Sequence, residues 1–130
     1  MNDYIRQVLI SAHTIAIVGL SDKPNRPSYQ VAQYLQDHGY RIVPVNPLAN
    51  EILGEKSYPK LSDIPFKVDL VDVFRRPEEC LQVAQEAIEI EAQALWLQLG
   101  ISNEDAKDLA LKHHIHFIEN MCIKIEHTHL

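Results

Sequence analysis

Five short apolar runs alternate with segments of helical periodicity along this chain, and that alternation limits the folds open to it. The runs are rich in Val, Ile and Leu and occupy residues 14–18, 41–45, 68–74, 94–97 and 115–118. Strands that alternate with helices through short loops form a parallel sheet with right-handed crossovers. The sequence therefore predicts an α/β, Rossmann-like, doubly wound and mostly parallel five-stranded sheet with helices on both faces.

Segments of helical periodicity precede the first run and lie between the others, and they supply the expected cover of the sheet. Residues 3–12 and 28–38 each place apolar side chains three and four positions apart, as one face of an amphipathic helix does. Pro44 lies within the second apolar run, and proline cannot donate to a central strand ladder. We therefore place Pro44 near the carboxyl end of its strand.

Two further helices are expected in the second half of the chain. One follows Pro77 and buries the stripe formed by Leu81, Ala84 and Ile88. The other begins where Ser102 and Asp105 resemble a capping box.

Length and composition fit one domain over residues 1–130. A chain of 130 residues buries roughly two-thirds of its unfolded surface on folding, and hydrophobic and charged fractions of 46% and 23% are ordinary for a folded domain. No apolar stretch approaches the roughly 20 residues of a membrane span. Cys80 and Cys122 lack metal-site spacing, which favours two free thiols and a cytoplasmic protein.

Charge is distributed unevenly along the chain. The formal net charge is −6, which argues against non-specific binding of nucleic acid. Residues 1–76 contain nine Lys and Arg against eight Asp and Glu, whereas residues 77–130 contain three against ten. A small anionic ligand is therefore expected at the loops of the first half.

The loop after the first apolar run has the features of a phosphate site. Gly19 allows a sharp turn where a side chain would block a ligand, and the next helix presents unpaired N–H groups at the positive end of its dipole. Lys23 and Arg26 add positive charge there. The three-glycine fingerprint of dinucleotide-binding folds is absent, so an ordinary strand-to-helix turn without a ligand is the alternative.

Five segments at the expected carboxyl ends of the strands carry a resemblance to a known family. They read VGLSDKP at 18–24, PVNP at 44–47, VDVFR at 71–75, LWLQLG at 95–100 and CIKIEH at 122–127. On these segments the chain resembles the small stand-alone CoA-binding proteins, whose fold is that of the CoA-binding domain of the succinyl-CoA synthetase α subunit. The likeness extends from about residue 14 to the C-terminus.

The resemblance implies non-covalent binding of coenzyme A or an acyl-CoA at the carboxyl edge of the sheet. The first loop would hold the phosphates, the end of the second strand would line the nucleotide, and the loop after the third long strand would contact its base or ribose. Residues farther along the edge would border the pocket. By position these residues are Gly19, Leu20, Ser21, Lys23 and Arg26, then Val45, Asn46 and Pro47, then Phe74 and Arg75, and finally Gln98 and Gly100.

Two departures from the family pattern bear on affinity. The family usually has an arginine before the cysteine of its last segment, where this chain has Met121, and the synthetase subunit has a lysine where Ala49 stands. One alternative function is accordingly a scaffold whose nucleotide pocket has decayed. Another is a redox carrier or enzyme that uses Cys122 with the CoA thiol.

For several other residues that could take part in catalysis or metal binding, the sequence favours a structural role. Phe74 ends an apolar strand, where a ring either packs in the core or stacks on a base. His113, His114 and His116 lack a recognisable metal-ligand spacing, so no metal is expected. Asp72 would need a hydrogen-bonding partner inside the sheet. No Ser-His-Asp order or nucleophile elbow is present, so we assign no catalytic residue and expect a small-molecule ligand rather than nucleic acid or a membrane.

Overall fold

A parallel five-stranded sheet forms the centre of the computed structural model, which describes residues 1–130. Its strands are β1 (Thr14–Val18), β2 (Arg41–Val45), β5 (Leu70–Val73), β6 (Ala94–Leu97) and β7 (His116–Ile118). Their order across the sheet is β2-β1-β5-β6-β7, and every neighbouring pair is parallel. The predicted α/β, Rossmann-like architecture is therefore confirmed.

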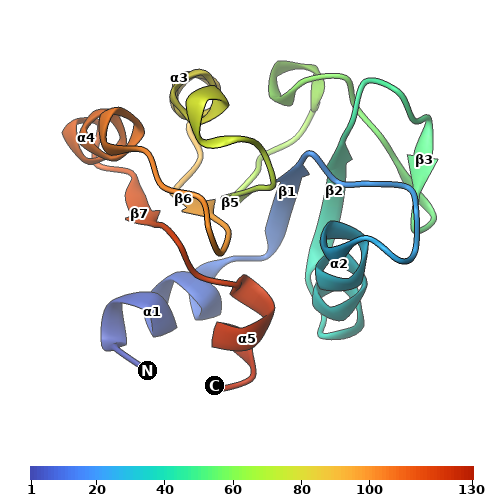
Figure 1. Ribbon diagram of the computed structural model, residues 1–130, viewed down its shortest axis with the longest axis horizontal. Helices are drawn as coiled ribbons and strands as arrows, with labels where there is room; N and C mark the ends of the chain where they lie inside the picture. The colour runs from blue at the N-terminus through green and yellow to red at the C-terminus, as the bar shows by residue number, and fades with distance from the viewer.

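Helices cover both faces of this sheet (Figure 1). On one face lie α1 (Asp3–Ser11), α2 (Pro27–Asp37) and α5 (Ile123–His127), and on the other lie α3 (Cys80–Glu89) and α4 (Glu104–Lys112). The short 3-10 helices η1 (Leu61–Asp63) and η2 (Pro77–Glu79) precede β5 and α3. No helix is both long enough and apolar enough to cross a bilayer.

Each face of the sheet buries its own hydrophobic cluster. Val18 and Val45 belong to the cluster that packs against α3 and α4, whereas Ile15, Ile17 and Trp96 belong to the cluster under α1, α2 and α5. Strands that are buried on both faces read as continuous apolar runs rather than as alternating ones. This is why the sequence marks the strands so clearly.

The two edge strands of the sheet are covered in different ways. Beside β2, a hairpin of β3 (Glu51–Ile52) and β4 (Glu55–Lys56) leads to Tyr58, whose N–H donates to the Pro44 carbonyl (3.0 Å). Pro44 thus lies at the end of an edge strand, where its missing N–H breaks no central ladder. At the opposite edge, the Tyr4 hydroxyl accepts a hydrogen bond from the Phe117 N–H of β7 (2.8 Å).

Two helices differ in detail from the sequence prediction. The residues that α3 buries are Cys80, Val83, Ala84 and Ala87, while Leu81 and Ile88 are only partly buried. Of the predicted stripe, Ala84 is buried as expected and Ile88 packs against the core, whereas Cys80, Val83 and Ala87 take the other buried positions. The segment after Pro77 first makes the 3-10 turn η2, so the α-helix begins only at Cys80. Helix α4 is capped by Asn103, whose Oδ1 accepts the Ala106 N–H (2.8 Å), rather than by Ser102.

Helix α5, which the sequence prediction lacks, is anchored by two hydrogen bonds to β6 and the residue that follows it. The Trp96 indole N–H donates to the Met121 carbonyl (2.8 Å), and the Gln98 Oε1 accepts the Ile123 N–H (3.1 Å). Trp96 is thus fully buried with its N–H paired.

The Asp72 carboxyl is buried in the sheet without a hydrogen-bond partner. It lies on β5 between Ile17 of β1 and Trp96 of β6, is fully inaccessible to solvent, and neither of its oxygens is paired. The expectation of a partner inside the sheet is therefore wrong. Burial raises the pKa of Asp72 well above its ordinary value and so favours the neutral acid.

Candidate functional site

The carboxyl edge of the sheet has a crevice where the strand order reverses. The chain places β2 on one side of β1 and then returns to place β5 on the other side. In open parallel sheets such a reversal leaves a crevice at the carboxyl ends of the strands, and ligands bind there. The loops that follow β1, β2 and β5 surround this crevice.

The backbone of Gly19 passes close to the backbone of Phe74 at this edge. It follows β1 with a φ of +86°, and a Cβ at this position would collide with the Phe74 carbonyl oxygen. The Gly19 N–H donates to the Val45 carbonyl (3.1 Å), and the Phe74 N–H donates to the Val18 carbonyl (2.8 Å). Only glycine tolerates a left-handed backbone against a main-chain carbonyl, so three strand ends meet tightly here.

Asn46 joins the loop after β1 to the end of β2. Its Nδ2 donates to the Leu20 carbonyl (2.9 Å), and its Oδ1 accepts the Leu48 N–H (2.8 Å). Its own carbonyl accepts from the Ser57 hydroxyl (3.1 Å), and its N–H donates to the Tyr58 carbonyl (3.0 Å). Because both ends of the amide are occupied, Asn46 fixes the shape of the rim.

The loop into α2 leaves the N-terminus of that helix open. Ser28 Oγ accepts the Ser21 N–H (3.0 Å) and Ser21 Oγ accepts the Lys23 N–H (3.1 Å), which fixes the path of the loop. Arg26 occupies the N-cap position, and no side chain caps the helix. Pro27 at the start of α2 has no N–H, so the N–H groups available to an anion are those of Ser28 and Tyr29, next to the exposed side chains of Lys23 and Arg26.

A cavity of about 350 Å³ opens at this edge on the α3 side of the sheet. Val18 and Val45 contribute apolar surface to it, and Lys60 and Arg75 contribute positive charge. The remaining lining residues are Pro59, Glu79, Gln82, Val83 and Glu86. With two cations and two carboxylates, this cavity suits a polar but uncharged group such as a nucleoside.

The two carboxylates of this cavity compete for its cations. Arg75 Nη1 lies 3.6 Å from Glu79 Oε2 in a partly exposed ion pair. Burial raises the pKa of Glu86, the neighbouring Glu89 raises it further, and Arg75 and Lys60 oppose that shift. Arg75 is therefore partly neutralised before any ligand arrives, and the uncapped α2 terminus is the more strongly positive part of the edge.

Ten of the twelve residues expected at the site fall into three environments. Gly19, Ser21, Lys23 and Arg26 border the open end of α2, and Pro47 is exposed beside Asn46. Val45 and Arg75 line the 350 Å³ cavity. The side chains of Leu20 and Gln98 are buried, and Gln98 holds α5, so these two residues present little to a ligand.

Phe74 and Gly100 lie away from this cavity. The Phe74 ring packs against the cluster under α2 and α5, on the face of the sheet opposite to the cavity wall formed by Val83. Gly100 lies in the exposed loop after β6, where its N–H donates to Asn120 Oδ1 (2.7 Å). In these positions Phe74 packs against the core, and Gly100 helps to shape the loop after β6.

The sequence prediction missed seven of the nine residues that line this cavity, among them Lys60, Gln82 and Glu86. Lys60 comes from the loop beyond the β3–β4 hairpin, and Gln82 and Glu86 come from α3. A signal existed for the helical pair, because Glu79, Gln82 and Glu86 are polar at spacings of three and four and therefore share one side of a helix. The position of Lys60 depends on the course of a loop and has no comparable signal.

The two cysteines differ in environment. Burial, and then the nearby charges of Glu79 and Glu78, raise the pKa of the Cys80 thiol to about 11, so Cys80 stays protonated and unreactive. Cys122 is a partly exposed free thiol at the N-cap of α5. No group of three His, Cys, Asp or Glu side chains is placed to bind a metal ion.

Comparison with known protein families shows to which family this chain belongs. Residues 13–128 match the family model described as the CoA binding domain. The chain belongs to this CoA-binding domain family. The resemblance drawn from the rim segments is therefore confirmed.

Relatives of this CoA-binding domain include both short proteins and parts of long enzymes. YneT of Bacillus subtilis (strain 168) is 42% identical over 124 residues, which are 95% of this chain and 92% of that protein. The ADP-forming acetate–CoA ligase II of Archaeoglobus fulgidus is 33% identical over 100 residues, which are 72% of this chain but 14% of the ligase. This chain thus corresponds to a small part of the ligase.

Solved structures share the fold of this CoA-binding domain closely. A hypothetical protein from Pyrococcus horikoshii OT3 has a TM-score of 0.93 and 38% identity, covering 97% of this chain and 89% of that one. A protein from Thermus thermophilus has a TM-score of 0.93 and 34% identity, covering 99% and 98%. The Rossmann-like fold is therefore shared across almost the whole chain.

Proposed function

We propose that this protein binds coenzyme A or an acyl-CoA non-covalently at the carboxyl edge of its sheet and performs no chemistry of its own. The observation that carries the proposal is the tight turn at Gly19, which opens onto an uncapped helix N-terminus flanked by Lys23 and Arg26. Membership of the CoA-binding domain family supports CoA as the ligand. The acetate–CoA ligase relative is also named for an activity that involves CoA.

The diphosphate of CoA would lie against the loop from Gly19 to Arg26. Backbone N–H groups at the start of α2 would donate to the phosphate oxygens, and the helix dipole would favour the negative charge. Lys23 and Arg26 are exposed and make no salt bridge within the protein, so both are free to pair with phosphate. The site is thus largely formed before the ligand binds.

The adenosine part of CoA would occupy the cavity between the strand ends and α3. Its apolar surface at Val18 and Val45 would contact the base, and Gln82, Glu79 and Arg75 would meet polar atoms of the base and ribose. Phe74 and Gly100 would act on the ligand through the shape of their loops. The pantetheine arm would leave along the rim toward the loop after β6.

We propose that this protein is cytoplasmic, because its two cysteines form no disulfide and free thiols are typical of a reducing compartment. Cys80 and Cys122 are both free.

A panel of ligands tests the proposed function. The purified protein is heated with CoA, dephospho-CoA, NAD or ATP, and the midpoint of unfolding is measured. CoA should raise the midpoint the most, because only a ligand that binds the folded state stabilises it. Equal indifference to all four ligands would refute the proposal.

Two charge-removing variants locate the site within the protein. Lys23→Ala and Arg26→Ala should each weaken CoA binding by about fivefold to tenfold, as expected for the loss of one charge-assisted hydrogen bond. Lys112→Ala removes an exposed lysine from the last turn of α4, at the opposite edge of the sheet, and serves as the matched control. Equal effects from all three variants would show that only net charge matters.

A further inference from the structure

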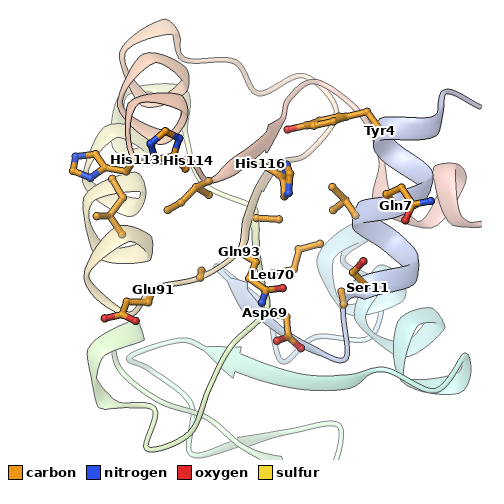
Figure 2. Close-up of a pocket in the computed structure, with 16 residues that line it drawn as sticks. Tyr4, Gln7, Ser11, Asp69, Leu70, Glu91, Gln93, His113, His114 and His116 are labelled. Carbon is orange, nitrogen blue, oxygen red and sulfur yellow. The ribbon is translucent and has the colours of Figure 1, made fainter.

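A second cavity of this protein lies at the amino-terminal edge of the sheet, opposite the crevice. Its volume is about 510 Å³, within the range of roughly 300–1,000 Å³ typical of small-molecule sites. Helix α1 forms one wall, and the C-terminal ends of α3 and α4 form the other (Figure 2). The starts of β5, β6 and β7 lie between these walls. The proposed CoA site is at the other ends of the strands and does not include this cavity.

This cavity has a negative electrostatic character. Its acidic lining residues are Asp69 and Glu91, and no Lys or Arg lines it. The histidines His113, His114 and His116 are its other titratable lining residues. Helices α3 and α4 both end beside it, so the negative ends of two helix dipoles face the space. The half of the chain that supplies these helices, residues 77–130, has ten acidic residues against three basic ones. These features stabilise a cation and repel an anion.

Asp69 provides a carboxylate that is already held in position. Its Oδ2 accepts hydrogen bonds from the backbone N–H groups of His13 (2.9 Å) and Thr14 (2.8 Å). Both bonds use the same oxygen, which leaves Oδ1 for a ligand. Because the side chain is partly buried and fixed, pairing with a cation costs little conformational entropy.

Tyr4 provides an aromatic ring that is likewise fixed. Its hydroxyl accepts the Phe117 N–H (2.8 Å), and its ring meets the His116 ring edge-on at a centroid distance of 5.3 Å. The Tyr4 side chain is 42% exposed, so part of its surface is accessible. Figure 2 shows Tyr4 and Asp69 toward opposite ends of the cavity. Aromatic faces attract ammonium groups.

Apolar side chains form part of the stretch between these two residues, beside the polar side chains of Ser11, Gln93 and His116. Leu70, Ala94, Ile115 and Val8 line it, and all four are buried core residues. A hydrocarbon chain would therefore contact this stretch, while a charged group would meet Asp69 at one end or Tyr4 at the other. This order of surfaces matches a molecule with an aliphatic middle and two positive ends.

We propose that the amino-terminal cavity binds an aliphatic diamine or polyamine. One ammonium group pairs with the free oxygen of Asp69, the methylene chain packs over the apolar side chains, and the second ammonium group lies against Tyr4. Glu91, on the α3 wall, adds a second negative charge near the ligand.

Calorimetric titration of the full chain tests this proposal. Putrescine and spermidine are the probes, and an uncharged diol of the same carbon-chain length as putrescine is the control, all at constant ionic strength. Saturable binding of at least one amine, with no binding of the diol, is the expected result. Absence of saturable binding by both amines, or equal binding of the diol, would overturn the proposal.

Three variants and one control locate the binding. Asp69→Asn keeps an oxygen for the two backbone N–H groups while it removes the charge, and it should weaken amine binding by about tenfold. Glu91→Gln, at an exposed position, and Tyr4→Leu should each weaken it by about threefold. Glu55→Gln, in the β3–β4 hairpin, is the control and should change nothing. Unchanged affinity in both Asp69→Asn and Glu91→Gln would contradict the assignment.

Discussion

The two edges of the sheet offer opposite chemistry to a ligand. At the carboxyl edge a ligand would meet mainly backbone groups, at the turn of Gly19 and at the open N-terminus of α2. The exposed side chains of Lys23 and Arg26 lie beside them. At the amino-terminal edge a ligand would meet side chains, namely Asp69, Glu91 and Tyr4, beside two helix C-termini. A parallel sheet produces this polarity because every helix on it runs in the same direction relative to the strands.

Replacing Gly19 should have the largest effect on the carboxyl edge. In Gly19→Ala the new Cβ meets the Phe74 carbonyl oxygen, and the residue keeps a φ of +86° that alanine disfavours. We expect the free energy of unfolding to fall by about 3 kcal/mol, the sum of a left-handed backbone penalty and a steric clash. Urea denaturation measures this change.

Gly54→Ala is the matched control for that variant. Gly54 also has a positive φ, of +77°, but no atom lies within 4 Å of its added Cβ. Only the backbone penalty remains, so the loss should be about 1 kcal/mol. Equal losses in the two variants would show that the close approach of Gly19 to Phe74 does not matter.

Asp72 lies in the sheet between the two edges and should make stability depend on pH. Its folded-state pKa is raised above the ordinary 3.8 by burial, so the folded protein keeps this proton to a higher pH than the unfolded chain does. The stability it contributes is present below about pH 4 and is lost as the pH rises toward the folded-state pKa. This loss amounts to at most about 1.4 kcal/mol for each pH unit.

The variant Asp72→Asn removes the titrating carboxyl, so the difference in stability between the two proteins reports the titration of Asp72 alone. The stability of the variant relative to the natural protein should increase from pH 4 to pH 7, whatever its absolute value, because the asparagine amide does not ionise. Urea denaturation at a series of pH values measures the difference. A difference that stays constant over this range would mean that the Asp72 carboxyl has an ordinary pKa.

Tyr4→Phe should have the smallest effect, and it probes the amino-terminal edge. The variant keeps the ring but loses the hydroxyl that accepts the Phe117 N–H. We expect a loss of about 1 kcal/mol and faster hydrogen exchange at the Phe117 amide, because this amide belongs to an edge strand. Unchanged exchange at Phe117 would show that Tyr4 does not protect the edge.

Much of the fold was predictable because its strands are buried on both faces. Their apolar runs gave the five strands, and the periodicity between the runs indicated the first four helices. Helix α5 was not predictable, since this five-residue helix and Met121 before it are held by hydrogen bonds with Gln98 and Trp96 that exist only after folding. The start of α3 also depended on a local 3-10 turn that the sequence does not specify.

The candidate sites were predictable to different degrees for a related reason. The loop at Gly19 is continuous in sequence, so its turn, cations and helix start could be identified together. The lining contributed by Lys60 and Gln82 comes from distant segments, and so does the amino-terminal cavity, which joins α1 to the ends of α3 and α4. Such sites arise from tertiary packing and leave no contiguous pattern.

The most direct test of the central claim is an NMR titration of the isotope-labelled protein with CoA, followed at the backbone amides. The account predicts saturable shifts at Gly19, Ser21, Lys23 and Asn46, with the amides of Gln93 and His116 at the opposite edge unmoved. Shifts confined to the amino-terminal edge, or no saturable shift at all, would contradict it.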